Sequence, residues 1–152
     1  MKSVIVAVGR WKRGPERALF EHYAARLKPA VTLREVEERK KLPPEELKLK
    51  EAELLLGGVP DGARIIVLDG GGKTLSSLAL AKQVGAWRDA GIRENAWLIG
   101  GADGHGNAAL KKADLVLSLG AQTWPHLLVR AMLAEQLFRV QCILSGHPYH
   151  RE

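Results

Sequence analysis

The residues best suited to chemistry lie in the loop between a short apolar segment and a long apolar one. His126 and Arg130 are four residues apart, so on a helix they project from one face, one turn apart. Thr123 is predicted to be the N-cap of this helix, and Pro125 fits its first turn, where a missing N–H costs nothing. A polar cluster in a strand-to-helix loop predicts a ligand site, although a histidine at a helix start also often bonds only to backbone.

Three glycine-containing loops are predicted to meet at one edge of a sheet. They follow apolar segments and are Leu68-Asp69-Gly70, Ile99-Gly100-Gly101 and Gly120–Pro125. The carboxyl ends of parallel strands lie together, and glycine lets a backbone approach a flat ligand closely. Each glycine taken alone could simply turn the chain, but the three loops together favour a binding site.

The C-terminal tail combines aromatic and cationic side chains, namely His147, Tyr149, His150 and Arg151. An aromatic ring with neighbouring cations can stack a base and bind phosphate, whereas most termini fray. From the residues alone a disordered end is favoured. The two histidines lack the cysteine or carboxylate partners that would complete a metal shell, so no metal site is predicted.

Segments of strand and helix character alternate along the chain. Strands are expected at Ser3–Val8, Thr32–Val36, Arg64–Leu68, Ala96–Ile99 and Leu115–Leu117. Helices are expected at Pro15–Leu27, Pro43–Leu56, from Ser76 or Ser77 onward, at Asn107–Lys112 and at Leu127–Leu144. This alternation predicts a single α/β domain over 1–152, with a mainly parallel sheet and helices on both faces. The last helix is apolar nearly all round, so it is expected to face both the sheet and a second copy of the chain.

Composition narrows the class of partner. The chain has 152 residues, a formal net charge of +6 and a pI near 9.7, which favours a polyanion such as nucleic acid over an uncharged partner. A solvated basic surface is the alternative. One cysteine, Cys142, excludes a disulfide framework, and the N-terminal apolar run is too short for a secretion signal, so a cytoplasmic protein without membrane contact is expected.

Two stretches of the sequence partly resemble nucleotide-binding motifs, but neither fulfils the requirements of its motif. Gly72-Lys73-Thr74 follows a strand, but a P-loop needs a glycine where the chain has Val67. Gly104–Ala109 fits G-x-G-x-x-A by letter, yet it begins several residues after its strand and has no acidic residue about 20 positions later. Neither a triphosphatase nor a dinucleotide-binding protein is predicted.

The combination of motifs resembles the RlmH family of SPOUT-class methyltransferases, which act on pseudouridine in large-subunit (23S) ribosomal RNA. The resemblance covers the whole chain. It is carried by Ile99-Gly100-Gly101-x-x-Gly104, Leu117-Ser118, Pro125-His126-x-x-x-Arg130, the helix from Leu133 to Arg139 and the ending His-Pro-Tyr-His-Arg-Glu. One departure is Ala102-Asp103, where the family often has Pro-Glu; the acidic side chain is one methylene shorter, so no role is assigned to Asp103.

The resemblance implies a C-terminal trefoil knot, a rare exception among folds, and a homodimer built on the knot helices. It implies that S-adenosylmethionine lies in the three loops already selected. The residues implied to bind it are Leu68, Asp69, Gly100, Gly101, Gly120, Ala121, Gln122, Thr123, Trp124 and Pro125. The tail is expected to approach the cofactor of the other subunit.

The activity implied is methyl transfer to N3 of a pseudouridine, on the assembled ribosome. His126 is expected to be an orienting group or base, and Arg130 a phosphate or dimer contact. Tyr149, His150 and Arg151 are expected to hold the nucleotide. Two alternatives stay open: a SPOUT methyltransferase for another target such as transfer RNA, and a basic RNA-binding module without chemistry.

Overall fold

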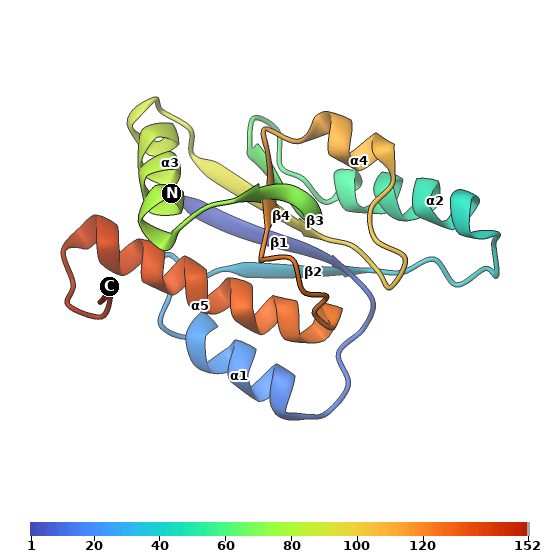
Figure 1. Ribbon diagram of the computed structural model, residues 1–152, viewed down its shortest axis with the longest axis horizontal. Coiled ribbons are helices and arrows are strands. Elements are labelled where there is room, and N and C mark those ends of the chain that lie inside the picture. The colour runs from blue at the N-terminus through green and yellow to red at the C-terminus, as the bar shows by residue number, and fades with distance from the viewer. Residues whose placement is uncertain (152) are drawn as a thin grey trace.

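The computed structural model describes residues 1–151 and contains one five-stranded, all-parallel sheet in the order β2-β1-β4-β3-β5 (Figure 1). The strands are β1 (Lys2–Val8), β2 (Thr32–Val36), β3 (Arg64–Thr74), β4 (Glu94–Ile99) and β5 (Leu115–Ser118). The helices are α1 (Pro15–Ala24), α2 (Pro44–Gly57), α3 (Ser77–Asp89), α4 (Asn107–Lys112) and α5 (His126–Ser145). The predicted α/β class, with a parallel sheet, is therefore confirmed.

Helices cover both faces of the sheet because its central strands are apolar on both sides. On one face, Ile5, Ile66 and Trp97 pack against α1, α3 and α5. On the other, Val6, Val67 and Leu98 pack beneath α2 and α4. Figure 1 shows α5 running along the first face, with its start near the carboxyl ends of the strands. The trefoil knot stays a prediction.

The start of α5 differs from the prediction. The helix begins at His126, with Pro125 in the N-cap position and extended, and no side chain caps it. Proline disfavours helical geometry in the residue before it, which keeps Trp124 out of the helix. Thr123 is therefore too early to be the N-cap, and that expectation is wrong. Ser76 does cap α3 as predicted, accepting a hydrogen bond from the Ala79 N–H at 3.1 Å.

Strand β3 continues beyond Leu68, where the prediction ended it. Leu68 pairs with Leu117 of β5, and Lys73 pairs with Leu117 again, so the intervening residues form a bulge. The Asp69 carboxylate closes this bulge by accepting a hydrogen bond from the Gly71 N–H at 2.9 Å. The stretch predicted as a simple loop is therefore a bulge held within the sheet, and it presents Asp69 at the sheet's edge.

None of the helices within residues 1–151 is long and apolar enough to cross a membrane.

Gly72 is predicted to be essential for the bulge. A Cβ at this position would lie 2.6 Å from the carbonyl carbon and oxygen of Val116, both backbone atoms that cannot move aside. Gly72→Ala should therefore lower the free energy of unfolding by about 1–3 kcal/mol, measured by urea denaturation. Gly70→Ala is the matched control, because nothing lies within 4 Å of a Cβ there. Equal stability of the two variants would contradict the description of the bulge.

Candidate functional site

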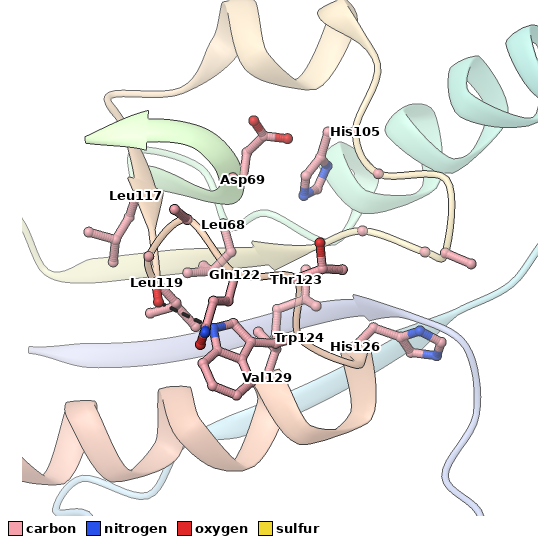
Figure 2. A pocket seen from close by; sticks show the side chains of 18 residues that line it. Leu68, Asp69, His105, Leu117, Leu119, Gln122, Thr123, Trp124, His126 and Val129 are labelled. Atoms are coloured by element: carbon pink, nitrogen blue, oxygen red, sulfur yellow. Dashed lines mark hydrogen bonds between the residues drawn. The ribbon is translucent and has the colours of Figure 1, made fainter. Parts of the chain in front are cut away.

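The three predicted loops meet in one pocket of about 270 Å³ at the carboxyl edge of the sheet (Figure 2). The bulge of β3, the loop after β4 and the loop after β5 each contribute to its wall. Of the residues implied to bind the cofactor, those that line it are Leu68, Asp69, Gly100, Gly101, Gly120, Ala121, Gln122, Thr123 and Trp124. Pro125 is not among the lining residues; its carbonyl accepts the Val129 N–H at 3.0 Å.

Glycines form much of this wall, for two different reasons. Gly100 and Gly101 are closely packed: a Cβ at Gly101 would lie 3.0 Å from the Glu51 carboxylate and 3.2 Å from Val8. Gly120 instead has a φ of +112°, a backbone conformation that residues with a Cβ rarely adopt. The pocket therefore offers bare backbone N–H and C=O groups to a ligand.

An aromatic side chain stands at the entrance. Trp124 is 38% exposed, and its indole N–H donates to the carbonyl of Leu119 at 3.3 Å (Figure 2). This hydrogen bond fixes the ring at the rim of the pocket, where it can cover a flat ligand.

His126 lines the same pocket at the first residue of α5. Its Nε2 atom lies 3.7 Å from where a Cβ would stand on Gly9, at the end of β1. Burial lowers the pKa of His126 below the ordinary value of 6.5, and the cations Arg130 and Lys12 lower it further. The imidazole is therefore neutral at pH 7 and can accept one hydrogen bond while donating another.

Arg130 is fully buried, at 0% exposure. Its Nη1 donates to the Glu35 carboxylate at 2.7 Å, and its Nη2 donates to the carbonyls of Val8 at 3.3 Å and Gly9 at 3.1 Å. The guanidinium also stacks over the ring of Trp11 at 4.6 Å. The expected contact of Arg130 with a phosphate or a second subunit does not fit this burial, because the side chain is enclosed and both of its Nη atoms already donate within the fold. Its position supports the start of α5 instead.

The tail packs on its own helix. The Tyr149 hydroxyl donates to the Glu135 carboxylate at 3.0 Å, and Arg139 donates to His150 Nδ1 at 3.0 Å. The Tyr149 ring meets Phe138 edge-on, with centroids 4.7 Å apart. Burial and the Glu135 hydrogen bond raise the pKa of Tyr149 to about 12. The expectation of a disordered end, favoured from residues alone, is wrong up to Arg151, while Glu152 lies outside the described residues.

The tail and the pocket are separate within one chain. Glu135, which binds Tyr149, is nine residues after His126, or about 14 Å along the helix axis. Tyr149, His150 and Arg151 are accordingly absent from the residues that line the pocket. The structure therefore brings His126 to the predicted loops but does not bring the tail there.

Among the titratable residues that line the pocket, His105 was not predicted as a site residue. His105 lines the wall from the loop between β4 and α4 and lies near Asp69 in Figure 2. A histidine within a glycine-rich loop that follows a buried strand was the available signal. Residues 1–151 contain no group of three metal-ligating side chains that could hold an ion.

A family model described as Predicted SPOUT methyltransferase matches residues 1–150. The chain belongs to the SPOUT methyltransferase family. Proteins named Ribosomal RNA large subunit methyltransferase H are similar over 99% of both chains: that of Paramagnetospirillum magneticum is 53% identical, and so is that of Rhodospirillum rubrum. The corresponding protein of Methylobacterium nodulans is 46% identical over 99% of this chain and 98% of its own.

The fold of the chain is also similar to that of a solved structure. A methyltransferase of Legionella pneumophila, solved in complex with the bound cofactor S-adenosylmethionine, is similar with a TM-score of 0.50 and 16% identity. The match covers 90% of this chain and 65% of that one. At this identity the likeness supports the fold alone.

Removing a cation should make His126 more basic. Lys12 is exposed and lowers the pKa of His126, so Lys12→Met should raise that pKa, measured by NMR titration of the imidazole. Lys82→Met, an exposed lysine on α3, is the control and should leave the titration unchanged. An unchanged pKa in Lys12→Met would mean that the basic loop does not approach the pocket.

Proposed function

We propose that this protein transfers the methyl group of S-adenosylmethionine to N3 of a pseudouridine in large-subunit ribosomal RNA. The observation that carries the proposal is the meeting of three loops from separate strands in one glycine-walled pocket, in a chain of the SPOUT family. Full-length relatives named as large-subunit ribosomal RNA methyltransferases supply the substrate class.

The pocket fits an adenosine-containing cofactor. Leu68, Leu117 and Leu119 give it an apolar wall, and the glycine loops leave backbone groups open to the edges of a flat base. The Asp69 carboxylate adds one acidic acceptor at the sheet edge, suited to hydroxyl, amino or cationic groups. When bound, S-adenosylmethionine supplies a methyl group already activated by its sulfonium.

The residues of the chain then have three tasks: to align the acceptor nitrogen, to exclude water and to assist loss of the N3 proton. Alignment of reacting atoms is the largest of these when the donor is already activated. The neutral His126 at the pocket can accept a proton or hold the base by a hydrogen bond. Arg130 and Glu35 act through His126, because they fix the start of α5.

The surface around the pocket suits RNA. The basic loop after β1 contains Arg10, Lys12 and Arg13, and Lys12 is close enough to influence His126. Positive charge of this kind attracts phosphate without sequence specificity. N3 lies on the Watson–Crick edge of the base, so the target nucleotide must be unpaired.

A homodimer would unite the tail with the pocket. Residues of α1, α3 and α5 line an apolar groove of about 580 Å³, which shares Leu117, Leu119 and Gly120 with the cofactor pocket. We call it the α1–α3–α5 groove; Leu19, 42% exposed, lies on it. An exposed apolar groove of this kind suits a second copy of the chain. A partner seated there would bring its own tail close to the pocket.

The substrate is proposed to be the assembled ribosome in the cytoplasm. The described residues form one small α/β unit around a single five-stranded sheet. A ribosomal surface can complete a site that such a unit cannot build alone.

The direct test uses ribosomes from cells that lack the gene. Purified protein and methyl-labelled S-adenosylmethionine are incubated with them, and the digested RNA is identified by mass spectrometry. We expect labelled N3-methylpseudouridine in large-subunit RNA, and much less label on protein-free RNA. Label on transfer RNA instead would contradict the proposed substrate and favour a transfer RNA methyltransferase. Absence of both label and cofactor binding would contradict the proposal as a whole.

The tail is predicted to act on the pocket of the other subunit. Replacing Tyr149, His150 and Arg151 with alanine should reduce methyl transfer at least 100-fold, yet leave S-adenosylmethionine affinity within about threefold. Ala121→Trp, at an exposed loop position lining the pocket, should abolish cofactor binding.

Mixed dimers of these two variants provide the control. Each mixed dimer would contain one intact pocket facing one intact tail, so activity should return to as much as half of the wild-type level. Full activity of the tail variant alone, or inactive mixed dimers that still bind cofactor, would contradict a shared site.

A further inference from the structure

His105 stands against the glycine loop that follows β4. It lines the cofactor pocket, and three of its ring atoms, Cδ2, Cε1 and Nε2, each lie 3.2 Å from where a Cβ would stand on Gly100. The ring therefore occupies the space that the missing side chain leaves. This contact fixes an imidazole at the sheet edge, opposite the bulge of β3 (Figure 2).

The Nε2 atom of His105 is buried without a hydrogen-bond partner among residues 1–151. Leaving a buried polar atom unpaired costs about 1–3 kcal/mol, and native structures rarely tolerate it without a ligand or water. Because the atom belongs to the wall of a pocket, the bound molecule is the natural source of the missing partner.

The charge state of His105 defines what it can bind. Burial lowers its pKa below 6.5, although Asp69 and the carbonyls of Leu98 and Leu68 oppose that shift. The imidazole is therefore neutral at pH 7, with one N–H donor and one bare nitrogen. Asp69, which lines the same part of the pocket, is an acceptor only. Together they offer a donor and an acceptor from two different loops.

This pair suits the uncharged half of the cofactor. An adenine edge presents an amino donor beside a ring-nitrogen acceptor, and ribose hydroxyls can do both. The amino-acid half is a zwitterion, which is costly to bury against a neutral ring and apolar walls without charged partners on both sides. We propose that His105, with Asp69, hydrogen-bonds the adenosine half of S-adenosylmethionine and helps to determine the nucleoside that the pocket accepts. The inference rests on cofactor binding in the proposed function, and not on the RNA substrate.

Binding of two probes tests this assignment without any catalysis. S-adenosylhomocysteine contains both halves of the cofactor, whereas 5′-methylthioadenosine lacks the amino-acid half. By calorimetry, His105→Leu should weaken both probes by about tenfold, the effect of one lost hydrogen bond. His105→Gln places an amide N–H near the Nε2 position and should bind both within about threefold of wild type. His105→Asn, whose amide reaches only the Nδ1 position, should resemble His105→Leu.

Controls separate a local effect from unfolding. His22→Leu changes an exposed histidine on α1 and should alter neither affinity, and the thermal midpoint of each variant checks the fold. The inference is overturned by unchanged affinity in His105→Leu, by equal loss in the Gln and Leu variants, or by a loss for S-adenosylhomocysteine alone. If the wild-type protein binds neither probe, the proposed function itself fails, which is a different result.

Discussion

The ion pair between the buried Arg130 and the partly buried Glu35 is the interaction on which the geometry of the site depends. It joins α5 to β2, and the same guanidinium binds the carbonyls of Val8 and Gly9 at the end of β1. Removing Glu35 would leave the buried charge of Arg130 uncompensated, at a typical cost of about 3–5 kcal/mol. Because Arg130 is one turn after His126, the pair fixes where α5 starts, and hence where the loop after β5 can lie.

The remaining walls of the pocket follow from close backbone packing. The bulge in β3 is possible because Gly72 lies directly on the backbone of Val116 and Leu117, and it carries Asp69 to the sheet edge. Gly101 lies against Val8 and Glu51 on the neighbouring elements. The site is thus made mainly from main-chain groups held by a rigid sheet, an arrangement that reduces the entropy lost when a ligand binds.

Much of the fold could be predicted because its signals are local. Continuous β-branched runs such as Val4–Val8 predict buried parallel strands, and the glycines after them predict converging loops. Two predicted boundaries, the start of α5 and the end of β3, were wrong because other local interactions competed with the predicted ones. Pro125 shifted the helix start away from Thr123, and a second pairing with Leu117 extended β3 through residues that look like a loop.

Tertiary packing determined the rest of the site, so the sequence alone could not supply it. Arg130 has the spacing of a surface contact, but its burial depends on Glu35, 95 residues away. His105 became a candidate only when its ring was found against Gly100. The sequence of the tail predicts a disordered end, yet Glu135 and Phe138 hold Tyr149 on α5. Long-range partners of this kind leave no periodic signal.

We propose that one edge of the sheet, where the three loops meet, binds the cofactor. The most direct measurement is NMR mapping of backbone amides as S-adenosylhomocysteine is added to the ¹⁵N-labelled protein. We predict little change at the amino end of the sheet around Asn95, and the largest shifts at Asp69, Gly100, Gly101, Gly120 and Ala121. Saturable binding with shifts gathered around Asn95 and Trp97, and none in the three loops, would contradict it.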